Sequence, residues 1–172
     1  MRWKLTFPVR APMGFVFDWM TTPDPTDTEF TPGLTKREIT EKWKLQYTTK
    51  DEGTIAGTKY ASKAVLRKYP PRRWRLEEEA GPFYHRTEFS LSETPEGCEM
   101  TVEVEVIVRG LLKMREKSFR GKLNADFEKR VVAWIDRVEQ EAKSSATPAA
   151  VGPAADFNKK EAPRDIPRQY GS

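Results

Sequence analysis

Glu78 and His85 are the two side chains best suited to acid/base chemistry, and they lie on either side of the dipeptide Gly81-Pro82. A β-hairpin centred on this dipeptide pairs residues at equal distances from it, which places Glu78 opposite His85 and Trp74 opposite Phe89. An imidazole beside a carboxylate gains basicity and titrates near neutral pH. The pair therefore predicts an acid/base or ligand-orienting dyad, with a structural ion pair at the rim of a cavity as the alternative.

The expected neighbours of this pair are apolar. Trp74, Leu76 and Phe89 alternate with charged or polar residues along the same two strands, so they share one face of the sheet with the pair. A carboxylate and an imidazole on an apolar face are costly to bury unless they are paired. We therefore expect the dyad to face an interior cavity that Trp74, Leu76 and Phe89 also line.

Further side chains complete the expected lining of this cavity. Tyr60 and Ser62 fall on the same parity as Ala64 and Leu66, so their hydroxyls are either polar handles for a ligand or ordinary strand hydroxyls with satisfied hydrogen bonds. The remaining expected lining residues are apolar, and each also fits a plain packing role: Val104, Val106, Phe127 and Trp134.

The composition excludes several other classes of site. Cys98 and His85 are the only cysteine and the only histidine, which rules out an internal disulfide and a Cys/His zinc cluster, and we expect no metal and no cofactor. Neither a glycine-rich phosphate loop nor a serine nucleophile elbow occurs. The 30 basic and 26 acidic residues are interleaved, which predicts a mixed-charge surface and no nucleic acid partner.

The hydropathy of the sequence indicates the expected cellular location of the protein. The first residues alternate charged and apolar side chains, unlike a signal peptide, and no apolar run approaches membrane-spanning length. The sequence thus predicts a soluble cytoplasmic protein without integral membrane association. Two basic clusters, Arg72-Arg73 with Arg75 and Lys113–Lys117, fit either contact with an anionic headgroup or a solvated edge.

Alternating apolar and polar residues predict the strands of one antiparallel sheet. Residues 39–47 place Trp43 and Leu45 on the apolar parity, which fits one long strand or two short ones. We expect Asp51-Glu52-Gly53 and Ala56-Gly57 to form the turn that follows. Tight turns between the later strands predict a meander. The other expected elements are a strand over Arg2–Val9, a short helix over Met13–Met20, a turn at Asp27–Phe30, and strands over Tyr60–Leu66, Arg72–Ala80, Phe83–Ser92 and Cys98–Arg109.

The clearest periodic signal is a C-terminal amphipathic helix. Apolar residues recur every three or four positions from Phe119 to Ala142, with charged residues between them. This helix of roughly six to seven turns needs a broad, concave apolar surface, and the alternating strands supply one. The 172 residues suit a single domain with a tail. We expect the domain to span residues 1–143 and the Ala- and Pro-rich residues 144–172 to be disordered.

Three stretches carry a family resemblance: Pro12–Pro23, Pro71–Leu76 and His85–Leu91. They resemble the first helix, the Pro-Pro-Arg start of a central strand, and the following hairpin of the START-like (SRPBCC) superfamily, which includes polyketide cyclase/dehydrase and birch-pollen-allergen folds. The resemblance covers about residues 1–143. It implies an α+β helix-grip fold, in which a curved antiparallel sheet of six or seven strands wraps around a long C-terminal helix, with one or two short helices after the first strand.

For function, the resemblance implies a cavity between the sheet and the long helix. The leading expectation is binding or transport of a hydrophobic small molecule, such as a lipid, polyketide or isoprenoid. One alternative is a cyclase/dehydrase-type lyase or isomerase that uses Glu78 and His85, and another is a chaperone-activator-like protein-interaction module. The identity of the ligand and the oligomeric state stay open, because fold does not determine function.

Overall fold

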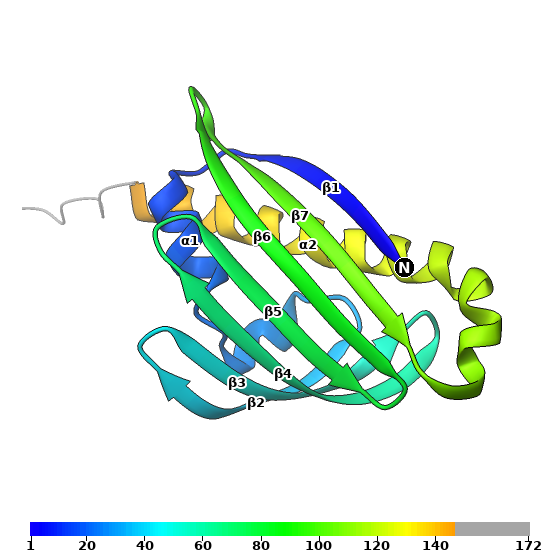
Figure 1. Cartoon of the computed structure of the whole chain (residues 1–172). Helices are drawn as coiled ribbons and strands as arrows, with labels where there is room; N and C mark the ends of the chain where they lie inside the picture. Colours follow the sequence, from blue (N-terminus) through cyan, green and yellow to red (C-terminus); the bar gives the residue numbers. More distant parts are fainter. Residues whose placement is uncertain (147–172) are drawn as a thin grey trace, which may run out of the picture.

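Seven antiparallel strands form one curved sheet around a long helix in the computed structural model, which describes residues 1–146 without the side chains of residues 111, 112, 115, 116 and 146 (Figure 1). The strand order is β1-β7-β6-β5-β4-β3-β2, so the expected helix-grip architecture is confirmed. The elements are β1 (Arg2–Val9), α1 (Met13–Met20), the 3-10 helix η1 (Pro25–Glu29), β2 (Leu34–Trp43), β3 (Gln46–Ile55), β4 (Thr58–Tyr69), β5 (Arg73–Ala80), β6 (Phe83–Thr94), β7 (Gly97–Val108), the 3-10 helix η2 (Gly110–Arg115) and α2 (Glu116–Ala146).

Strand β7, which lies between β1 and β6, shows how the sequence makes a two-faced sheet. Because successive side chains of a strand point to opposite faces, its alternating pattern sends one set to the interior. The buried set is apolar and consists of Cys98, Met100, Val102, Val104, Val106 and Val108. The three acidic residues of this strand, Glu99, Glu103 and Glu105, lie on the other face, so the concave face is the apolar one.

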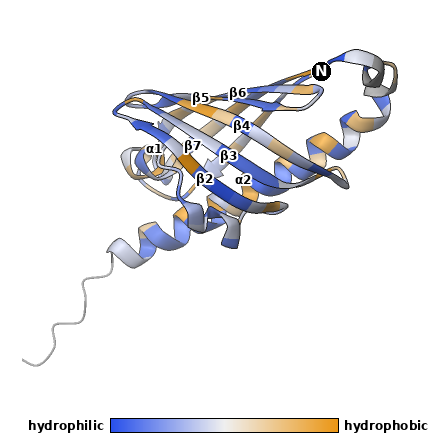
Figure 2. Ribbon diagram, turned by 90° about the horizontal axis from the view of Figure 1, so that it is seen from below, coloured by the Kyte–Doolittle hydropathy of each residue, from blue (hydrophilic) through white to orange (hydrophobic). Residues whose placement is uncertain are grey.

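Helix α2 lies across this concave face (Figure 2). Its buried apolar side chains are Leu123, Phe127, Val131, Ile135 and Val138, and all except Ile135 belong to the predicted stripe. The helix continues to Ala146, three residues beyond the expected domain boundary at residue 143. The rest of the segment that we expected to be disordered lies outside the described residues. None of the helices in the described part of the chain is long and apolar enough to cross a lipid bilayer.

The expected short helix and turn after β1 are both present. Val16 and Phe17 of α1 are buried in the core, and Asp24 caps η1 by accepting from the backbone N–H of Thr26. The Trp19 indole donates to Glu141 of α2 at 2.8 Å. This hydrogen bond therefore links the segment between β1 and β2 to the C-terminal half of α2.

The turn predicted at Asp51-Glu52-Gly53 is wrong, because β3 runs through these residues to Ile55. The chain reverses only at Ala56 and Gly57, whose φ angles are 51° and 77°. Gly53 does not form a turn; it allows the backbone of β3 to approach the backbone of Gly33 closely. A Cβ at this position would stand 2.0 Å from the carbonyl oxygen of Gly33, so only glycine lets β3 pass the loop before β2.

Residues 39–47 form parts of two strands, which settles the choice between one long strand and two. β2 and β3 reverse at Lys44 and Leu45. Trp43 and Leu45, expected on the apolar side, are 66% and 49% exposed. The turn places both side chains at the tip of the hairpin, where they are largely exposed.

Candidate functional site

The space between the sheet and α2 holds two separate cavities. One, here called the Glu78 cavity, has a volume of about 380 Å³ and is bounded by β4–β6 and the first half of α2. The other, the Trp74 cavity, has a volume of about 320 Å³ and is bounded by the α1–η1 segment and the second half of α2. On β5 the boundary falls between Leu76 and Glu78, and on α2 it falls between Arg130 and Trp134.

The site residues proposed from sequence are divided between the two cavities. Those that line the Glu78 cavity are Tyr60, Glu78, His85, Val106 and Phe127. Those that line the Trp74 cavity are Trp74, Leu76, Phe89 and Trp134. Ser62 lies behind Glu78, and Val104 is part of the buried core. The structure thus brings the dyad together with only some of the apolar side chains expected around it.

Strands β5 and β6 hold Glu78 and His85 in the predicted register, directly opposite each other. The His85 Nδ1 atom stands 3.7 Å from the Glu78 Oε2 atom, and the two side chains are 17% and 16% exposed. This separation is longer than a hydrogen bond. The other ring nitrogen lies 3.3 Å from the Thr87 hydroxyl, and the ring edge meets Phe127 of α2. His85 is therefore held on several sides while it faces the cavity.

Glu78 has a second partner, because the Ser62 hydroxyl donates to its Oε1 atom at 2.5 Å. Burial alone would raise the pKa of Glu78. Interactions with His85, Ser62 and Arg130 outweigh burial and hold this pKa below its ordinary value of 4.5. Glu78 is consequently a carboxylate at neutral pH, suited to accept a hydrogen bond.

The lowered pKa of Glu78 predicts a pH-dependent contribution to stability. Because the folded-state pKa lies below 4.5, this contribution is fully present above pH 4.5 and is lost as the pH falls through the folded-state value. We expect the free energy of unfolding of wild type to fall below pH 4.5 more steeply than that of Glu78→Gln, measured by urea denaturation across a pH series. Glu79→Gln, on the exposed face of β5, is the matched control and should keep the wild-type profile. Parallel profiles for wild type and Glu78→Gln would contradict the prediction.

Arg130 is a polar residue of the Glu78 cavity that the sequence analysis missed. It is only 9% exposed. Its guanidinium donates to the Pro32 and Thr54 carbonyls at 2.9 and 3.3 Å and to the Tyr60 hydroxyl at 3.3 Å. A signal for it was present, because Arg130 falls within the apolar stripe of α2, three residues after Phe127 and next to Val131.

Aromatic side chains also line the Trp74 cavity, and several of its polar groups bond to neighbouring side chains. Trp74 and Phe89 are stacked with ring centroids 4.8 Å apart. The Trp134 indole donates to the Thr31 hydroxyl at 3.0 Å, and the Trp19 indole is bonded to Glu141. The wall of the Trp74 cavity nevertheless holds more charged side chains than the wall of the Glu78 cavity, which is mostly apolar. Within residues 1–146, no group of three His, Cys, Asp or Glu side chains is placed to hold a metal ion.

The fold is shared with proteins of known structure. The Zhui aromatase/cyclase from Streptomyces sp. R1128 matches with a TM-score of 0.70 at 17% identity, over 87% of this chain and 98% of that one. A START superfamily protein from Mycobacterium smegmatis matches with a TM-score of 0.62 at 16% identity, over 81% and 98% of the two chains. The di-domain ARO/CYC BexL from the BE-7585A biosynthetic pathway matches with a TM-score of 0.66 at 14% identity, over 83% of this chain.

This chain spans half the length of BexL. No family model and no curated protein sequence matches the chain. At these identities the structural matches establish the fold, which is START-like (SRPBCC), and confirm the resemblance seen in the sequence.

Proposed function

We propose that this chain, with its START-like fold, binds an amphipathic, largely apolar small molecule in the Glu78 cavity. The observation that carries the proposal is the convergence of Tyr60, Glu78, His85 and Arg130 on one cavity whose other walls are mostly apolar. Its volume of about 380 Å³ falls within the range typical of small-molecule sites. Sparse polar groups in an apolar pocket orient a ligand, while apolar contact supplies most of the affinity.

The polar groups at this end of the cavity offer both donors and acceptors. Burial raises the pKa of Tyr60, so its hydroxyl keeps its proton and remains a possible donor. Glu78 is an acceptor, and Arg130 adds positive charge. We therefore expect a ligand with a hydroxyl or carbonyl directed at these side chains and a hydrocarbon or aromatic body against Phe83, Phe119 and Leu123.

Filling the cavity tests the binding proposal. Ala80 lines the Glu78 cavity from β5, so Ala80→Trp should weaken binding of the neutral fluorescent probe N-phenyl-1-naphthylamine about tenfold or more. Glu79→Trp places the same side chain one residue earlier on the exposed face and should bind like wild type. Urea denaturation checks that both variants are folded. No probe binding to wild type, or equal binding to Ala80→Trp, would contradict the proposal.

The natural ligand can be sought directly. Native mass spectrometry of the freshly purified protein, followed by denaturation and extraction, should release a stoichiometric apolar compound. Such a compound then replaces the fluorescent probe in the comparison of the two tryptophan variants.

A cyclase/dehydrase-type enzyme is the second candidate function. It is favoured by the contact between the Glu78 carboxylate and the His85 imidazole at the cavity wall, because these two groups are of the types that serve in acid/base catalysis. Two conservative variants separate the functions, because Glu78→Gln and His85→Gln keep the size of each side chain. In a carrier, both variants still bind the extracted compound, and the compound is not converted. In an enzyme, wild type converts an added precursor of that compound, and both variants bind the precursor but lose its turnover.

A further inference from the structure

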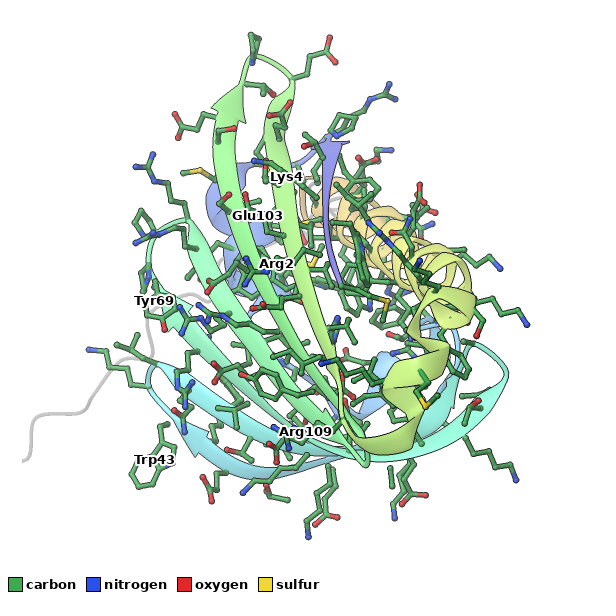
Figure 3. The ribbon with its side chains drawn as sticks, turned by 45° about the vertical axis from the view of Figure 1, so that its right-hand side comes forward. Arg2, Lys4, Trp43, Tyr69, Glu103 and Arg109 are labelled. Carbon is green, nitrogen blue, oxygen red and sulfur yellow. The ribbon has the colours of Figure 1, made fainter. Side chains whose placement is uncertain are left out.

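Two neighbouring hairpin tips carry exposed aromatic and aliphatic side chains. The turns between β2 and β3 and between β4 and β5 are side by side, since the backbone N–H of Lys68 donates to the Leu45 carbonyl at 2.8 Å. Trp43, Leu45 and Tyr69 are 66%, 49% and 38% exposed. Figure 3 shows Trp43 and Tyr69 projecting from the same edge of the sheet.

Cations surround these three side chains. Lys42 and Lys44 flank Trp43, Lys68 precedes Tyr69, and Arg72 and Arg73 follow it. None of these five cations forms an ion pair with a carboxylate of the described residues. The name hairpin patch is used below for the eight residues Lys42, Trp43, Lys44, Leu45, Lys68, Tyr69, Arg72 and Arg73.

The nearby carboxylates do not neutralise the hairpin patch. Glu77 is paired with Arg67, and Glu88 with Arg75 at 2.5 Å. Glu41 accepts a hydrogen bond from the neutral Thr48 hydroxyl at 3.2 Å and keeps its negative charge, so it offsets only one of the five positive charges. The patch thus presents net positive charge around a protruding apolar tip.

We propose that the hairpin patch docks the protein on an anionic lipid surface. Indole and phenol rings favour the headgroup level of a bilayer, where an aliphatic side chain such as Leu45 also finds apolar surroundings. Lys and Arg beside them reach lipid phosphates and gain from the negative surface potential. A nucleic acid would match the charge but offers no apolar environment for Leu45. The inference rests on the surface alone and stands independently of the proposed function.

Docking at this edge brings lipid close to the interior. Leu66 and Trp74 line the Trp74 cavity and flank the β4–β5 tip. Leu66 is three residues from Tyr69, which corresponds to about 10 Å along an extended strand. The Trp74 cavity is therefore the one that a docked lipid surface would approach.

Vesicle sedimentation of the full chain tests the docking. We expect wild type to sediment with vesicles of phosphatidylcholine and phosphatidylserine in equal parts, and much less with phosphatidylcholine alone. Lys42→Glu/Lys44→Glu should lower the affinity roughly tenfold or more, since each cation near such a surface contributes roughly fivefold. Added salt should weaken the binding of wild type. Trp43→Ala should also weaken it while leaving all five cations in place.

The matched control is Lys50→Glu/Lys63→Glu. These two lysines face each other across β3 and β4 on the exposed side of the sheet, away from the tips, and the double variant makes the same change in net charge. It should sediment like wild type. Equal loss in both double variants would mean that only net charge matters and would overturn the assignment to the hairpin patch. Failure of wild type to bind the anionic vesicles, with or without binding to a single-stranded oligonucleotide, would also overturn it.

Discussion

Replacing Arg37 by methionine is expected to destabilise the fold by about 3–5 kcal/mol, because it leaves the buried Asp51 carboxylate and the partly buried Asp27 carboxylate without their shared partner. Arg37 of β2 donates to Asp51 of β3 at 3.0 and 2.5 Å and to Asp27 of η1 at 2.6 Å. The Asp51 and Asp27 side chains are only 5% and 17% exposed. Burial alone would lower the pKa of Arg37, but Asp51 and Asp27 raise it above its ordinary value, so the cation is permanent.

The size of the expected loss in stability follows from the groups that remain after Arg37 is replaced. Methionine fills much of the same volume, so the loss is mainly electrostatic and not a cavity in the core. Lys36→Met is the matched control, because Lys36 pairs with Glu52 at 3.3 Å while both side chains are more than half exposed. It should cost less than about 1 kcal/mol. Urea denaturation at pH 7 measures both variants, and equal losses in the two would show that the Arg37 network contributes little.

The Arg37 network also shows why one part of the fold escaped prediction. Asp, Glu and Gly in succession favour a turn locally, and residues 51–53 have that composition. The structure keeps them in β3 because Asp51 meets Arg37 and Gly53 passes Gly33. Arg37 and Gly33 lie about twenty residues or less before Asp51 and Gly53 in the chain. Only the pairing of β2 with β3 brings them close to these residues. A local turn signal cannot contain that information.

The register of β5 and β6, in contrast, was predictable because it is determined by a local turn signal. Gly81-Pro82 fixes the turn, and every pairing then follows by counting outward, including Glu78 with His85. The side-chain alternation of each strand also determines which residues face inward. Sequence alone therefore identified the dyad and the face on which it lies.

The division of the interior into two cavities was not predictable in this way. Alternation assigns Trp74, Leu76 and Glu78 to the same face, but it does not say which part of α2 each one meets. In the structure, Leu76 and Glu78 fall in different cavities. Near the boundary between the cavities, Arg130 reaches from α2 to Tyr60 of β4. Among the described residues of α2, it makes the most hydrogen bonds to the strands and to the loop before β2.

Replacing Arg130 by methionine should therefore affect both stability and the proposed site. The change removes hydrogen bonds to the Pro32 and Thr54 carbonyls and to Tyr60, and we expect a loss of roughly 2–4 kcal/mol in the free energy of unfolding. Lys129→Met is the matched control one residue earlier on α2. Its side chain is 71% exposed and lies 3.9 Å from Asp126, so this change should cost less than about 0.5 kcal/mol.

Binding of two probes then separates the role of Arg130 in the fold from its role in the cavity. Arg130 supplies positive charge to the wall of the Glu78 cavity, so Arg130→Met should weaken binding of the anionic probe 8-anilinonaphthalene-1-sulfonate more than binding of neutral N-phenyl-1-naphthylamine. A variant that is merely loosened would change both affinities together. Titration of the folded variant with each probe, below the urea concentration at which it unfolds, distinguishes these results. An equal change for both probes would assign Arg130 to the fold alone, because only a charged ligand group senses the lost cation directly.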